Sequence, residues 1–142
     1  MNRTVRNISA RLSLRRPQDE SLDILARVLE SVELSKDPDL ERDLEVIKSM
    51  YCSVQDFERD FPSICFALAT GVGKTRLMGA FISYLYLTSR SRHFFVLAPN
   101  LTIYDKLKED FSPQSPKYVF RGIQEFIANP PVIITGEDYD SG

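Results

Sequence analysis

Leu68-Ala69-Thr70-Gly71-Val72-Gly73-Lys74-Thr75 is the stretch that decides which fold the sequence predicts. Phosphate-binding loops follow the pattern Gly-x-x-x-x-Gly-Lys-Ser/Thr between a strand and a helix, and Leu68 stands here in place of the first glycine. The apolar segment 62–68 predicts a buried strand before the loop, and the apolar segment 74–88 predicts a helix after it. This context favours a phosphate-binding loop over a glycine turn that lies beside a lysine by chance.

The loop residues have distinct chemical roles in such a site. Gly71 and Gly73 allow the backbone to curl, so that successive N–H groups can point at phosphate oxygens. Lys74 supplies a positive charge for the β- and γ-phosphates, and Thr75 supplies a hydroxyl ligand for Mg²⁺. We therefore predict ATP and Mg²⁺ as cofactors, Thr75 as the residue that reaches the metal through the nucleotide, and a nucleotide-binding loop of Ala69, Thr70, Gly71, Val72, Gly73, Lys74 and Thr75.

The rest of the chain predicts further strands alternating with helices, which is typical of a parallel α/β sheet. The remaining expected strands are 94–98, 117–120 and 131–135, and the expected helices after the loop begin at Asn100 and Gly122. Upstream, Pro17 opens a helix, and the pair Asp37-Pro38 predicts an N-cap and the first turn of a second helix. Residues 1–16 have no strong period and predict irregular structure or a short strand.

Composition limits the possible functions. The net charge is −2, so any contact with nucleic acid must come from a local patch or from a larger assembly. Five arginines in the first sixteen residues favour a solvated tail over an arm beside phosphates. Cys52 and Cys65 indicate neither a disulfide framework nor a zinc site, and Cys65 in its apolar run is expected in the core. No stretch has membrane-spanning length, which favours a cytoplasmic protein.

Three segments resemble superfamily-2 helicases and translocases. The loop is similar to their motif I, which often replaces the first glycine. The segment 14–22 resembles the upstream glutamine motif, in which Gln18 would read the adenine edge. The segment 95–101 resembles motif Ia, in which Pro99 and Asn100 would contact a nucleic-acid backbone, although Asn100 can equally be a simple N-cap. The run from Ala98 to Leu107 is most similar to the restriction subunit of type III restriction enzymes.

This resemblance implies an architecture. Residues 1–60 would form an N-terminal arm and helices that carry the glutamine motif. Residues 61–142 would form a partial RecA-like P-loop NTPase domain, with a parallel sheet and flanking helices. The acidic motif that completes such sites is missing from the sequence, because Asp105, Glu109 and Asp110 fit the solvent face of a helix. The acidic run 137–140 has the wrong order of residues for that motif.

The resemblance also implies a function. The chain would be the ATP-binding N-terminal fragment of an ATP-dependent DNA translocase or helicase of the type III restriction class. Its partners would be DNA, through the full-length protein, and a modification (methyltransferase) subunit, with no membrane contact. We expect weak nucleotide binding without turnover by this chain alone. Two alternatives remain open: a fragment of another DEAD/DEAH-box helicase, including one that acts on RNA, and a truncated, non-catalytic nucleotide-binding module.

Overall fold

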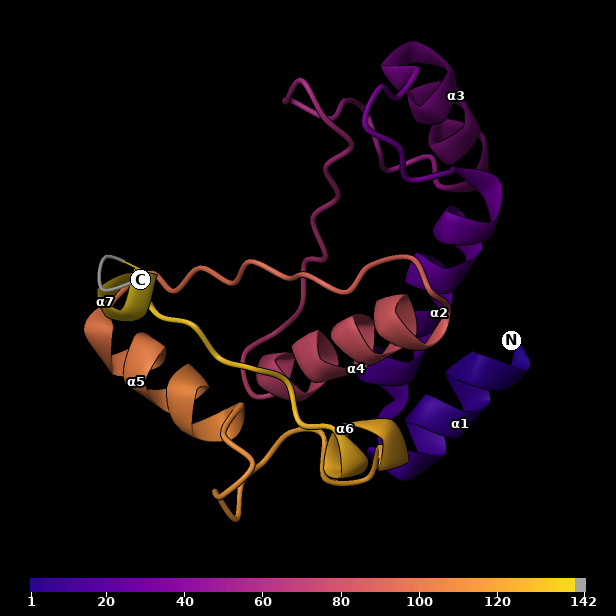
Figure 1. Ribbon diagram of the computed structural model, residues 1–142. Helices are drawn as coiled ribbons and strands as arrows, with labels where there is room; N and C mark the ends of the chain where they lie inside the picture. Colours follow the sequence, from indigo (N-terminus) through magenta and orange to yellow (C-terminus); the bar gives the residue numbers. More distant parts are fainter. Residues whose placement is uncertain (140–142) are drawn as a thin grey trace.

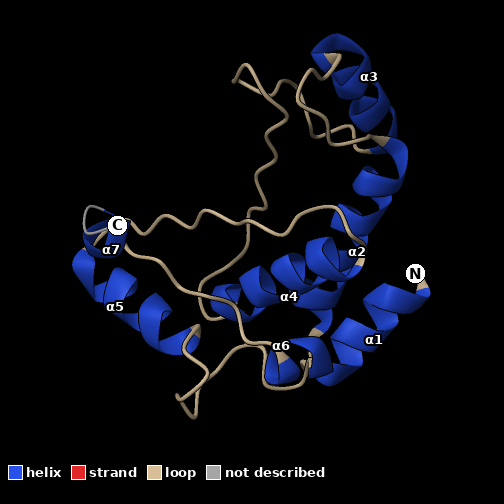
Figure 2. Cartoon of the chain, viewed as in Figure 1, coloured by secondary structure: helices blue, strands red, loops and turns tan. Residues whose placement is uncertain are grey.

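The computed structural model describes residues 1–139 of the chain, and within them it contains only helices and the loops that join them (Figures 1 and 2). In chain order the helices are α1 (Arg3–Arg11), α2 (Arg16–Ser31), α3 (Leu40–Met50), α4 (Lys74–Leu87), α5 (Leu101–Asp110), α6 (Gln124–Ala128) and α7 (Gly136–Tyr139). Helices α1, α2 and α4 pack against one another, whereas α3 packs on the far half of α2.

The prediction of a parallel α/β sheet of RecA-like form is wrong for the described residues, because none of them forms a strand. The segments 62–68, 94–98 and 131–134 are long loops whose backbone groups make no hydrogen bond to other backbone groups. A strand exists only when a partner accepts and donates along its length. Their apolar sequences fitted buried strands, but pattern alone does not supply the pairing.

The third expected strand, 117–120, is also absent, for a different reason. Its residues form successive turns, in which the N–H of Tyr118 donates to the carbonyl of Ser115 and that of Ile123 to the carbonyl of Phe120. The N–H of Val119 donates to the carbonyl of Asp110 at 2.8 Å and ties these turns to the end of α5. The aromatic side chains of this segment are buried by this arrangement without any sheet.

Helix α1 occupies a region that was expected to be irregular or a short strand, and that expectation is wrong. The side chain of Asn2 caps the helix by accepting a hydrogen bond from the N–H of Val5 at 2.8 Å. Val5, Ile8 and Leu12 follow at helical spacing, and all three are buried. The arginines of α1 lie on its exposed side, so the basic start of the chain is solvated but ordered.

The other helix starts follow local capping signals. Pro17 lies in the first turn of α2, as predicted, and Asn100 caps α5 by accepting from the N–H of Ile103 at 3.0 Å. Helix α3 starts two residues later than the Asp37-Pro38 pair suggested. Its N-cap is Asp39, whose carboxylate accepts from the N–H of Arg42 at 3.1 Å. Helix α3 therefore begins after Asp39, because this carboxylate, and not that of Asp37, accepts a hydrogen bond from the first turn.

One apolar core holds the parts that surround the candidate site. It joins α1, α2, α4, the end of α5 and the turns up to α6, with Tyr84 and Phe120 among its fully buried side chains. Residues on both sides of position 60 therefore contribute to the same core. Cys65 is exposed, which corrects its expected core position. In the described part of the chain, none of the helices combines the length and apolar character needed to cross a bilayer.

Candidate functional site

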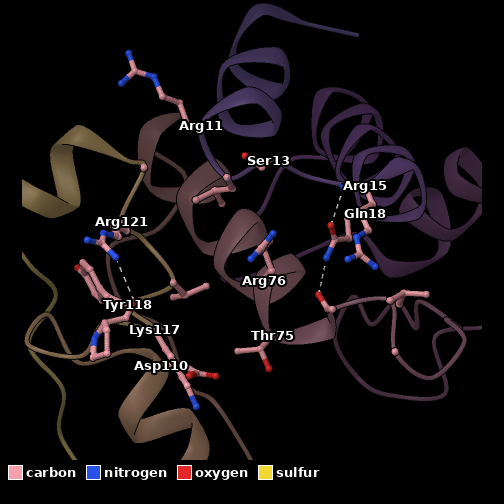
Figure 3. A pocket seen from close by; sticks show the side chains of 17 residues that line it. Arg11, Ser13, Arg15, Gln18, Thr75, Arg76, Asp110, Lys117, Tyr118 and Arg121 are labelled. Atoms are coloured by element: carbon pink, nitrogen blue, oxygen red, sulfur yellow. Dashed lines mark hydrogen bonds between the residues drawn. The ribbon is translucent and has the colours of Figure 1, made fainter.

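A pocket of about 480 Å³ lies where the start of α4, the start of α2 and the turns after α5 meet (Figure 3). This size falls within the range of small-molecule sites, roughly 300–1,000 Å³. The predicted site residues that line it are Gln18, Gly71, Val72, Gly73 and Thr75. Segments from positions 11–18, 71–76 and 110–122 are thus brought together around one opening.

The two glycines of the loop have the backbone conformation that only glycine adopts readily. Gly71 has φ +79° and Gly73 has φ +82°. Gly73 is also the N-cap of α4, and no side chain caps that end of the helix. The first N–H groups of a helix have no partner within it and carry a partial positive charge. The turn therefore presents uncapped donors beside the pocket.

Gln18 joins helix α2 to this turn. Its Nε2 donates to the carbonyl of Gly73 at 2.9 Å, while its Oε1 accepts from the N–H of Arg15 at 2.8 Å. The side chain is only 2% exposed, and a Cβ on Gly73 would collide with its Nε2. An amide has two donors and two acceptor lone pairs, so these two hydrogen bonds use half of its capacity. The adenine contact expected of Gln18 stays a prediction.

Most charged residues of the pocket wall are basic. Five cationic residues line it against one acid, Asp110; the cations are Arg11, Arg15, Arg76, Lys117 and Arg121. Figure 3 shows the Arg11 guanidinium turned away from the other side chains, and all five cationic residues are exposed. Of these, Arg121 is held by a hydrogen bond of 3.4 Å from its Nη1 to the carbonyl of Pro116. An excess of positive charge favours an anionic ligand.

Sequence reasoning missed several of these lining residues. Arg76 was detectable, since it follows the loop directly, one residue beyond Thr75. Lys117 and Tyr118 lie far along the chain and carried no signal of a site. Tyr118 donates its hydroxyl to the carbonyl of Phe126 at 2.9 Å, and burial raises the pKa of its phenol. It is therefore a neutral wall residue at physiological pH.

Other predicted residues lie outside the pocket. Ala69, Thr70 and Lys74 are exposed and do not line it. The ammonium of Lys74 forms no hydrogen bond or ion pair with the described residues, so it is free to move toward a ligand. Pro99 and Asn100 are exposed at the start of α5, away from the pocket lining. Of the acidic run 137–140, residue 140 lies outside the described residues.

A glycine turn at a helix start, beside a basic pocket, is typical of proteins that bind polyphosphates. The family model described as "Type III restriction enzyme, res subunit" matches residues 11–139, which is nearly the whole chain. The chain therefore belongs to this family, which confirms the resemblance to the N-terminal part of superfamily-2 helicases. No curated protein and no solved structure gives a significant match to it.

Proposed function

We propose that this pocket binds ATP with Mg²⁺, and that the chain is the nucleotide-binding portion of an ATP-dependent DNA translocase of the type III restriction class. One observation carries the proposal: the Gly71–Gly73 turn, Thr75 and five basic residues line one pocket. Membership of the family supports it, because the restriction subunits are helicase-like proteins that depend on ATP.

The residues present fit a nucleotide polyphosphate. Gly71 leaves open space where a side chain would project, and the uncapped start of α4 adds N–H donors. Arg15, Arg76 and Lys117 offer charge-assisted hydrogen bonds to phosphate oxygens. Thr75 is the hydroxyl that would face the magnesium ion, which would screen the phosphate charge. Lys74 would swing in from solvent to complete the phosphate contacts.

Binding of a fluorescent ATP analogue tests this function. The wild-type chain should bind it in excess MgCl₂, and Lys74→Ala should weaken binding about tenfold or more, since a hydrogen bond to a charged group contributes roughly 1.5–3 kcal/mol. Lys36→Ala is the matched control, because Lys36 is exposed and is not part of the pocket lining. Absence of binding by the wild-type chain at millimolar nucleotide would refute the proposal.

DNA and a methyltransferase subunit are the proposed partners of the full-length protein, on the strength of the family. Within this chain, the exposed Pro99-Asn100 corner at the start of α5 is the proposed contact with a DNA backbone phosphate. We also propose a cytoplasmic location. Hydrolysis is not proposed for this chain alone, since the pocket lining contains a single acidic residue.

A further inference from the structure

Asp110 is the one acidic residue in the pocket wall, and its placement departs from what its sequence suggested. It is the last residue of α5 and only 6% exposed, whereas its neighbours Asp105 and Glu109 are exposed. The reason lies in the turn that follows. The carbonyl of Asp110 accepts from the N–H of Val119, and Leu107 and Phe111 on either side are buried in the core. The last residue of α5 therefore lines the pocket.

The carboxylate of Asp110 has no partner among the described residues. It makes no side-chain hydrogen bond and no ion pair, although basic residues share the same pocket. No fully buried side-chain oxygen in the described chain lacks a hydrogen bond, so the oxygens of Asp110 keep contact with solvent, and Asp110 lines the pocket. A carboxylate that is unpaired and open to the pocket is available to a cation that enters with an anionic ligand.

Thr75 lies across the pocket from Asp110. Both residues line it, and in Figure 3 both side chains lie below Arg76. A carboxylate and a hydroxyl are hard oxygen ligands, which Mg²⁺ and Mn²⁺ prefer. The described residues contain no group of three or more potential metal ligands, so the protein cannot hold a divalent cation tightly by itself. Magnesium sites of this kind take one or two protein oxygens together with substrate phosphates.

We propose that Asp110 supplies the carboxylate for the divalent cation that accompanies the nucleotide, bound directly or through one water, on the opposite side from Thr75. The inference rests on the proposed function, because the nucleotide phosphates complete the ligand set. It assigns to the end of α5 a role that neither the loop motif nor the charge pattern of α5 indicated. It also accounts for the presence of Asp110 in a pocket wall whose other charged residues are all basic.

The distinguishing property is the coupling between metal and nucleotide. If Asp110 binds the cation, Asp110→Asn should bind nucleotide in EDTA at least as well as wild type, because a negative charge near the phosphates has been removed. The gain in affinity on adding MgCl₂ should fall about tenfold, within the usual range of coupling between two ligands. Glu109→Gln is the matched control, since Glu109 is the exposed neighbour on the same helix.

The experiment measures the affinity for a fluorescent ATP analogue in EDTA and in MgCl₂, for wild type and both variants. Electron paramagnetic resonance of Mn²⁺ with and without ATP provides a second readout: Asp110→Asn should release Mn²⁺ from the ternary complex, and Glu109→Gln should not. Melting temperatures check that the variants are folded. If Asp110→Asn is unfolded, Asp110→Glu replaces it, with a partial loss of the same coupling expected from its displaced carboxylate.

Two failures are distinguishable. A wild-type chain that binds nucleotide, with the same magnesium gain in Asp110→Asn as in wild type, would overturn the role of Asp110 and leave the proposed function standing. A wild-type chain that binds no nucleotide under either condition would overturn both. Tighter nucleotide binding by Asp110→Asn in EDTA and in MgCl₂ alike would show a carboxylate that only repels phosphate, which also contradicts the proposal.

Discussion

Gln18 uses one donor and one acceptor of its amide to hold the nucleotide loop against the start of α2. Glutamate at this position retains an acceptor for the N–H of Arg15 but cannot donate to the carbonyl of Gly73. We expect Gln18→Glu to lower the free energy of unfolding by about 1–3 kcal/mol, because that carbonyl loses its partner and a charge is buried. Gln55→Glu, at an exposed position, is the control. Urea unfolding measures both, and equal stabilities would mean that the hydrogen bond to the loop is not formed.

Tyr118 gives the pocket wall a dependence on pH. Its pKa is raised by burial, so in the folded chain its phenol stays neutral above about pH 10, the usual value for tyrosine. The stability that this neutral phenol contributes is complete below about pH 10 and is lost as the pH rises through the folded pKa. We expect Tyr118→Phe to be less stable at neutral pH by about 1 kcal/mol, through loss of the bond to Phe126, and to lose less stability in alkali.

The matched control for this change is Tyr139→Phe, since Tyr139 is exposed near the end of the described chain. Unfolding by urea between neutral and strongly alkaline pH measures the effect, with absorbance of the phenolate as a direct titration. An alkaline loss of stability that is the same in Tyr118→Phe as in Tyr139→Phe would contradict a buried phenol at position 118.

At the scale of elements, the turn that opens α4 depends on its two glycines to different degrees. Both have positive φ, but a Cβ would meet nothing within contact range at Gly71, whereas at Gly73 it would strike Gln18. Gly71→Ala should therefore cost only the backbone strain, about 1–2 kcal/mol. Gly73→Ala should cost more and should also weaken nucleotide binding, because the collision displaces Gln18. Thermal unfolding of both variants compares the two costs, and the reverse order would be inconsistent with the contact between loop and helix.

The helix ends were predictable and the sheet was not, because the two depend on interactions of different range. The starts of α2, α4 and α5 follow from Pro17, Gly73 and Asn100, residues that act within one turn. Even α1 carried readable signals, an Asn cap and apolar residues at helical spacing, which its high content of arginine obscured. Strand pairing instead requires hydrogen bonds between segments tens of residues apart, and nothing in an apolar run specifies them.

The candidate site divides in the same way. The loop residues Gly71, Gly73 and Thr75 could be predicted from their own motif, and Gln18 from the resemblance of segment 14–22 to the glutamine motif. Asp110 and Lys117 reach the pocket only through the tertiary packing of α5 and the turns behind it. Asp110 has the sequence pattern of a surface acid. The hydrogen bond from the N–H of Val119 to its carbonyl joins the end of α5 to the turns that follow, and Asp110 is buried there.

At the scale of the whole molecule, the three extended apolar segments leave large hydrophobic side chains in solvent. Phe95 is 88% exposed and Leu97 is 75% exposed, and the segment 132–134 is similarly open. Contiguous apolar exposure of this kind, combined with unpaired backbone groups, promotes association between chains. The chain should therefore bind apolar dyes such as anilinonaphthalene sulfonate and should associate increasingly with concentration.

The double substitution Phe95→Ser and Leu97→Ser should lower dye fluorescence and shift sedimentation toward the monomer without lowering the melting temperature, because neither side chain belongs to the core. Leu34→Ser is the control, since Leu34 is an exposed apolar residue in the loop after α2 and outside these segments. If instead the double variant unfolds, these residues are packed in solution as strands of a sheet would be. A loss of stability would thus show pairing of the extended segments, and its absence would show that the helical core is stable without them.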